Sequence, residues 1–226
     1  MTELIEEYQL LDAFWMTIKL TAYSAVISLI LGTILAVMRV SPVRIFEWVG
    51  TTYVTLLRNT PLTLIVLFCS LGLWGQLGIE LASRDSPTFI VDNGFRLAVL
   101  GLSVYHAAFV CEALRSGVNT IPLGQAEAAR SIGLTFTQSM TQVILPQAFR
   151  GAITPLGNVL IALTKNTTVV AAIGVAETAY RMKAIAEFEP SLLMVGFAIV
   201  ALGFVILTLP MGMLTSYLSA RLAVKR

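Results

Sequence analysis

The sequence is poor in the residues that serve catalysis, metal binding and disulfide pairing. Its 226 residues include two cysteines and one histidine. Cys69 and Cys111 both lie in apolar runs and have neither metal-ligand nor disulfide spacing. A single histidine, His106, cannot build a histidine-based metal cage. We therefore expect neither a metal site nor a catalytic residue in this chain.

Charge is scarce as well. Charged residues make up 12% of the chain, about half the share of a typical soluble domain, whereas hydrophobic residues make up 57%. The mean hydropathy is +0.83. A formal net charge of +2 is too small to favour binding to nucleic acid. This composition excludes a disordered tail and a secreted disulfide scaffold, and it indicates a membrane protein.

The apolar residues are concentrated in runs long enough to cross a bilayer, which takes about 20 residues. Five such runs lie at about 14–38, 53–79, 95–114, 152–175 and 191–218. No two-residue alternation is sustained, so strands are not expected. The acidic first dozen residues differ from a signal peptide, and the first run should stay in the mature chain. The sequence predicts one all-α membrane domain over residues 1–226, with five transmembrane helices.

Lysine and arginine residues are unequally divided between the two sets of loops. One set carries eight: Arg39, Arg44, Arg115, Arg130, Arg150, Arg221, Lys225 and Arg226. The other set carries four: Arg84, Arg96, Arg181 and Lys183. Because basic residues favour the cytoplasmic side, we expect the N-terminus outside and the C-terminus in the cytoplasm. The segment at about 115–150 is then the largest cytoplasmic loop.

This loop predicts a short helix. Pro122 suits the first helical turn, the run from Gln125 to Ile132 favours a helix, and Gly133 suits the left-handed position after its end. An apolar face of Ala128, Ala129 and Ile132 would suit a groove on another protein.

The loop also resembles the signature of ABC importer permeases, which reads E-A-A, three residues, G, nine residues, I, one residue, L-P. Here it reads Glu127-Ala128-Ala129, Gly133, Val143 and Leu145-Pro146, and Val143 in place of Ile is the only departure. Three further elements resemble those of the polar amino-acid permeases: Arg58-Asn59-Thr60-Pro61-Leu62, the run from Glu112 to Gly124, and Lys165-Asn166-Thr167-Thr168. Within that family the chain most resembles the smaller permease of a glutamate uptake system.

The resemblance implies a fold and a set of partners. The loop helix between the third and fourth transmembrane helices would be a coupling helix that contacts a cytoplasmic ATPase. The residues implied in this contact are Gln125, Glu127, Ala128, Ala129, Gly133, Leu145 and Pro146. The chain has no phosphate-binding loop, so ATP and Mg²⁺ would be bound by the ATPase, with no cofactor in this chain. A second permease subunit, expected to be a homologous but different chain, and an extracytoplasmic amino-acid-binding protein would complete an importer in a prokaryotic cytoplasmic membrane.

Polar residues inside the apolar runs are candidates for the substrate path. Lys165 is costly near the centre of a span, so it should face a partner or a water-filled path. With Asn166, Thr167 and Thr168 it could hold an anionic substrate, or it could pair with an acid such as Glu112 and only join helices. The neutral Asn166 favours an acidic or neutral amino acid over a cationic one.

Two other features have alternative interpretations. Arg58 and Asn59 precede Pro61, where we expect the helix to bend or restart, so Arg58 could face the path or anchor the helix at the membrane surface. His106 suits helix packing better than proton transfer. Ser24, Ser28 and Gly32 recur every four residues, a spacing typical of close helix packing.

The alternative function is a gradient-driven secondary transporter or channel subunit. Such a protein needs intramembrane acids that carry protons or sodium. Glu112, at the end of a span, is the one candidate that the sequence offers.

Overall fold

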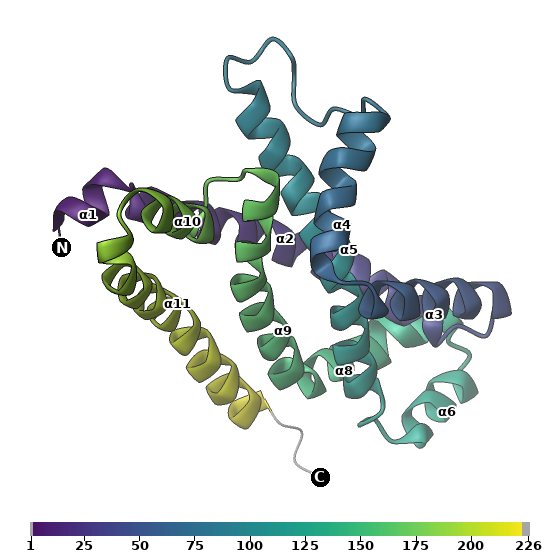
Figure 1. The fold of residues 1–226 in the computed structure, drawn as a ribbon. Coiled ribbons are helices and arrows are strands. Elements are labelled where there is room, and N and C mark those ends of the chain that lie inside the picture. Colours follow the sequence, from purple (N-terminus) through teal and green to yellow (C-terminus); the bar gives the residue numbers. More distant parts are fainter. Residues whose placement is uncertain (1, 223–226) are drawn as a thin grey trace.

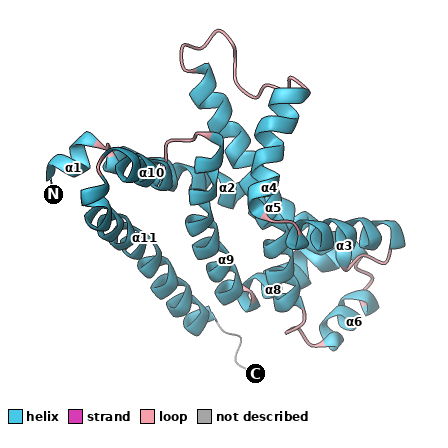
Figure 2. Cartoon of the chain, viewed as in Figure 1, coloured by secondary structure: helices cyan, strands magenta, loops and turns pink. Residues whose placement is uncertain are grey.

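The computed structural model describes residues 2–222 and shows only helices and connecting segments in that part of the chain. Figure 2 shows this arrangement, coloured by the type of structure. The all-α class predicted from the sequence is confirmed for the described residues.

Four helical stretches are long and apolar enough to cross a membrane. They are formed by α2 (Leu10–Arg39), α5 (Phe89–Val118), α9 (Ile153–Asn166) with the 3₁₀ segment η3 (Thr167–Ile173), and η4 (Pro190–Leu192) with α11 (Leu193–Leu222). Figure 1 shows α5 and α9 side by side near the middle of the molecule and α11 at its edge. Each stretch coincides with one of the expected apolar runs. The stretches of α2, α5 and α11 are longer than expected at both ends, whereas that of α9 and η3 ends just inside the expected 152–175.

The second expected run, 53–79, is not one straight helix. α3 (Arg44–Asn59) ends before Pro61, and α4 (Leu62–Leu67) restarts after it and continues as the π-helical η1 (Phe68–Gln76). The two parts are bent by 104°. Proline lacks the amide hydrogen of a helix interior and holds Thr60 in extended geometry, with ψ at 132°. The bend predicted at this proline is present. α3 begins at Arg44, nine residues before the expected start of this run at 53, and it runs in another direction than α4 and η1.

α2 and α5 pack closely through small residues. Ser24 and Ser28 are buried. A Cβ at Gly32 would lie 2.5 Å from the Val110 side chain and 2.8 Å from the Ala107 carbonyl oxygen. The interpretation of this stripe as a packing surface is confirmed.

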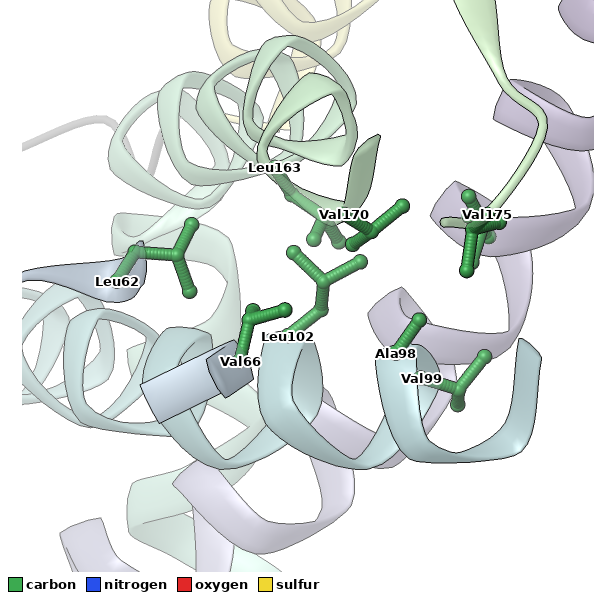
Figure 3. Close-up of a cluster of buried hydrophobic side chains, with 9 residues drawn as sticks. Leu62, Val66, Ala98, Val99, Leu102, Leu163, Val170 and Val175 are labelled. Carbon is green, nitrogen blue, oxygen red and sulfur yellow. The ribbon is translucent and has the colours of Figure 1, made fainter. Parts of the chain in front are cut away.

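The central core is a cluster of buried aliphatic side chains (Figure 3). Its members come from α2, α4, α5, α9, η3 and the turn after η3: Leu20, Leu62, Val66, Ala98, Val99, Leu102, Leu163, Val170 and Val175. The cluster fixes α4 and η3 against the middle of α5. Burial of these side chains positions the polar residues at the end of α9.

The remaining elements lie at the two ends of the bundle. α1 (Thr2–Glu7) and α10 (Thr178–Phe188) lie near one another in Figure 1. Between α5 and α9 the chain forms α6 (Leu123–Ser131), α7 (Phe136–Ser139), the π-helical η2 (Met140–Ile144) and α8 (Leu145–Gly151). The loop before α5 and the helix α6 after it therefore lie at opposite ends of a 30-residue helix.

Candidate functional site

The short helix predicted in the long loop is α6, and its ends follow the sequence signals closely. Pro122 precedes the helix with ψ at 134°, so it lies one residue before the first turn rather than in it. Gly133 has φ at +83°, the left-handed backbone expected after the helix end. The Gly133 and Leu134 amides donate to the Arg130 and Ala129 carbonyl oxygens, at 2.9 and 3.1 Å. These two bonds are the Schellman pattern, which requires a residue with positive φ at position 133.

α6 presents most of its side chains to the outside. Gln125, Glu127 and Ala128 are exposed, and Leu123 and Ile132 are 83% and 77% exposed at the two ends of the helix. Ala129 is buried. The predicted apolar face of Ala128, Ala129 and Ile132 was therefore wrong in one member. Ala129 faces inward, on a helix that packs against η2, whereas Ala128 and Ile132 are exposed.

The segment after α6 fixes it to the membrane helices. A capping box joins Thr135 and Gln138 at the start of α7. Pro146 is exposed in the first turn of α8, and Leu145 beside it is half-buried. α8 crosses closely over the end of α5. A Cβ added at Gly117 of α5 would collide with the Ala148 backbone of α8. Contacts therefore run from α6 through η2 and α8 to the end of α5.

A charged cluster lies near the same end of the bundle. The Glu112 carboxylate of α5 accepts a hydrogen bond from Arg39 of α2, and it lies 3.4 Å from Arg115 and 3.9 Å from Arg58. The Arg39 side chain is only 11% exposed, whereas that of Arg58 is 48% exposed. Arg58 also lies over the Phe109 ring, 5.8 Å from its centroid. We name Arg39, Arg58, Glu112 and Arg115 the arginine cluster.

The cluster bears on several candidates from the sequence. Arg58 and Glu112 are brought together, whereas the Asn59 amide bonds the Thr55 carbonyl oxygen within its own helix, at 2.8 Å. Among the residues that the structure describes, Lys165 forms no ion pair, and it is exposed. The suggested pairing of Lys165 with Glu112 is thus absent there.

A second polar group joins α5 and α9. His106 is 1% exposed, and its Nδ1 lies 2.9 Å from the Leu102 carbonyl oxygen. Its Nε2 lies 3.1 Å from the Asn166 amide nitrogen. Because an amide nitrogen only donates, His106 accepts at Nε2 and carries its proton at Nδ1. Both ring nitrogens are satisfied, which agrees with helix packing.

His106 and Asn166 line a pocket of about 310 Å³ between the two helices. Its other lining residues are Tyr105, Phe109, Asn158, Val159 and Ala162. Thr167 and Thr168 are not among the residues that line it. Their hydroxyls donate to the carbonyl oxygens of Thr164 and Lys165. Phe109 is shared, since it lines the pocket and also contacts Arg58 of the arginine cluster.

Sequence reasoning missed two parts of this arrangement. Asn158 lies eight residues before Asn166, a spacing that puts both on one helix face and could have been noticed. The arginine cluster had no local signal, because Arg39 and Glu112 are 73 residues apart.

Comparison with known proteins gives consistent results. Residues 28–224 match the family described as binding-protein-dependent transport system inner membrane component. A glutamate transport system permease protein, GluC of Corynebacterium glutamicum, is 60% identical over 96% of this chain and 95% of its own length. A probable glutamine ABC transporter permease protein, GlnM of Bacillus subtilis, is 34% identical over 94% of this chain and 92% of its own.

Solved structures are similar too. A chain in the crystal structure of an amino acid ABC transporter has a TM-score of 0.78 and 29% identity, covering 94% of this chain and 93% of that one. A chain of the MetNI methionine ABC transporter has a TM-score of 0.72 at 18% identity, which supports the fold alone.

Proposed function

The chain belongs to the family of binding-protein-dependent transport system inner membrane components, and from this premise we propose that it is a transmembrane permease subunit of an ATP-driven glutamate importer. The observation that carries the substrate is the 60% identity with a glutamate transport permease over 96% of the chain. The neutral Asn166 in the pocket wall also suits an acidic or neutral amino acid, because no carboxylate there would repel it.

We further propose that the α6 end of the bundle faces the cytoplasm and that α6 is the coupling helix. The excess of basic residues in the loops at that end supports this orientation. The exposure of Gln125, Glu127 and Ala128 supports docking into an ATPase. Closing of the ATPases on ATP would move α6, and the contact of α8 with Gly117 would pass this movement to α5. The resulting change is a population shift between inward-open and outward-open states.

The substrate path is proposed to run beside the pocket between α5 and α9. The Asn166 and Asn158 amides can hydrogen-bond a carboxylate or an ammonium group, and Arg58, which lies over the Phe109 ring, supplies positive charge near the α6 end. Lys165 is exposed and remains a candidate for the path on the surface that a second permease would cover. Thr167 and Thr168 would have a structural role, because their hydroxyls stabilise the 3₁₀ turn at the end of α9.

The proposed complex has further members. A second, homologous permease would complete the path, two ATPase subunits would bind ATP and Mg²⁺, and an extracytoplasmic protein would deliver the amino acid at the end of the bundle opposite α6. The exposed apolar side chains of α11 are suited to lipid or to a neighbouring membrane chain.

The surroundings of Glu112, the acid that the sequence offered for this role, do not favour a gradient-driven transporter. It would need an acid that is free to exchange a proton, whereas Glu112 lies among three arginines that favour its charged form.

The proposal is tested by extracting the chain gently from its native membrane and identifying the co-purifying proteins by mass spectrometry. We expect a stoichiometric ATPase with a phosphate-binding loop, a second permease and a glutamate-binding protein. A chain that purifies alone and still moves glutamate in vesicles without ATP would contradict the proposal.

A further inference from the structure

α3 is attached to the bundle along one side only. A Cβ at Gly50 would lie 2.8 Å from the Arg39 side chain and 3.4 Å from the Leu35 carbonyl oxygen, both in the last turns of α2. The Tyr53 hydroxyl donates to the Val104 carbonyl oxygen of α5, at 2.7 Å. Val54 is buried. These contacts place α3 at the end of the bundle that carries α6, as Figure 1 also shows.

The other two sides of α3 differ in chemistry. At 3.6 residues per turn, Arg44, Thr51, Thr55 and Arg58 fall on one side of the attached face. Ile45, Val49 and Leu56 fall on the opposite side, and they are 70%, 41% and 60% exposed. We name these three residues the apolar stripe. A helix with separate polar and apolar sides suits a boundary between water and hydrocarbon.

Trp48 lies where such a boundary would be. It is 69% exposed and falls between the polar side and the apolar stripe, away from the bundle. Tryptophan is enriched at the level of lipid headgroups because its ring is apolar and its N–H is polar.

The bend at Pro61 gives the direction of α3. The segment formed by α4 and η1 leaves α3 at 104°. If that segment crosses the membrane, as the proposed function requires, α3 is nearly parallel to the membrane plane. Its apolar stripe then meets acyl chains and its polar side meets water.

Charge indicates which lipids meet this surface. Around α3 lie four arginines, Arg39, Arg44, Arg58 and Arg115, but only two acids, Glu47 and Glu112. Arg44 and Arg58 are exposed. Basic groups beside membrane helices on the cytoplasmic side bind anionic headgroups through charge-assisted hydrogen bonds to phosphate.

We propose that α3 is an in-plane helix that binds anionic phospholipid, with the apolar stripe in the acyl chains and the exposed Arg44 at the phosphates. This assignment depends on the proposed membrane function. It differs from the expectation that residues from 53 onward cross the bilayer as one span.

The depth of α3 is tested in the complete transporter, with exposed native cysteines replaced, reconstituted in nanodiscs of phosphatidylethanolamine and phosphatidylglycerol. Nitroxide labels are attached to Ile45→Cys, Val49→Cys, Leu56→Cys and, as the matched polar control, Thr51→Cys. Power saturation then compares exposure to oxygen, which concentrates in hydrocarbon, with exposure to a water-soluble nickel chelate. Uptake and ATPase activity of the same preparations test the proposed function separately.

We expect the three stripe labels to be exposed to oxygen at one shared shallow depth and the Thr51 label to be exposed to nickel. A crossing helix would instead separate labels at positions 45 and 56 by about 16 Å in depth, at 1.5 Å per residue. Labels that neither reagent reaches would show that another protein covers the stripe. Either of these two results would overturn the proposal.

The lipid preference is tested by the ratio of phosphatidylglycerol to phosphatidylethanolamine that the purified complex retains. We expect Arg44→Gln to weaken anionic-lipid binding about fivefold, whereas the control Lys183→Gln on α10 leaves it unchanged. An unchanged ratio in Arg44→Gln would contradict headgroup binding by α3.

Discussion

At the scale of single residues, Glu112 is distinguished by its neighbours. Its single carboxylate is the counter-charge of three arginines, which lie on α2, α3 and α5. A cation as buried as Arg39 is costly without a partner, so Glu112 holds the ends of these helices together.

We predict that Glu112→Gln destabilises the chain, because Arg39 loses its counter-charge and the arginines repel each other. The expected cost is about 1–3 kcal/mol, below the range for fully buried pairs, since Glu112 is one-third exposed. The measurement is the apparent melting temperature and the amount of chain in the membrane.

The double variant Glu112→Gln/Arg39→Gln separates a structural role from a transport role. We expect it to recover much of the stability, because the unpaired buried charge is gone. If stability does not recover, the pairing with Arg39 is not what Glu112 contributes.

Gly117 is another residue whose role follows from distance. Any side chain there meets the Ala148 backbone, so Gly117→Ala must push α8 away from α5 at a cost of about 1–3 kcal/mol. Gly94→Ala, on the same helix, is the matched control, because its Cβ would lie 3.9 Å from the nearest atom. We expect a lower melting temperature and weaker coupling of ATP hydrolysis to uptake in Gly117→Ala alone.

At the scale of elements, the local features of this fold could be predicted from the sequence and the long-range ones could not. The end of α6 at Gly133 and the break at Pro61 depend on backbone rules that act over a few residues. The direction of α3 after that break depends on its contacts with α2 and α5. The inward side of Ala129 likewise depends on what packs against α6, which periodicity alone does not specify.

The arginine cluster and the pair of His106 with Asn166 illustrate the same limit within the candidate site. Their members are far apart in sequence and meet only because the aliphatic core positions α2, α5 and α9. Resemblance to a family indicated several of these residues as candidates, but it did not indicate which of them touch.

For α6 we predict that backbone strain, not steric crowding, limits substitution at Gly133. No atom lies within 4 Å of a Cβ there, but φ is +83°, which costs most residues about 1–2 kcal/mol and β-branched residues more. Glutamate uptake should therefore be highest in Gly133→Asn, close to that of the unaltered protein, lower in Gly133→Ala and lowest in Gly133→Val. Equal uptake in all three variants would show that this cap does not hold α6 in its docking position.

For α10 we predict a pH dependence of stability. Glu177 is fully buried at its start and accepts hydrogen bonds from the Ala179 and Tyr180 amides and the Thr178 hydroxyl. Burial raises the pKa of this carboxyl above 4.5 despite these bonds. Because the folded-state pKa exceeds the unfolded one, the contribution of Glu177 to stability is present at low pH and is lost as the pH rises through the folded-state pKa.

The variant Glu177→Gln should remove this dependence. We expect its melting temperature, relative to the unaltered protein, to rise from pH 4 to pH 8. Glu187→Gln, at an exposed acid of the same helix, is the control and should show no such trend. A relative melting temperature that falls with pH in Glu177→Gln would show that the carboxylate is better solvated by its hydrogen bonds than its burial indicates.

At the scale of the whole molecule, the chain combines a closely packed centre with two ends of different chemistry. The aliphatic core and the close contact of α2 with α5 hold the middle together, α6 is exposed at one end, and the loop before α5 lies at the other. This division suits a subunit that receives motion from an ATPase at one end and substrate at the other. The sequence has no phosphate-binding loop, so in the importer that we propose the ATP sites would belong to the ATPase subunits.

The most direct measurement is glutamate uptake into proteoliposomes that contain the complete complex, with ATP enclosed and the binding protein on the side opposite α6. We predict uptake that requires ATP, persists when ionophores collapse the ion gradients, and is lost in Gly133→Val. Uptake that continues without ATP and stops when the gradients collapse would contradict an ATP-driven importer and establish a gradient-driven carrier.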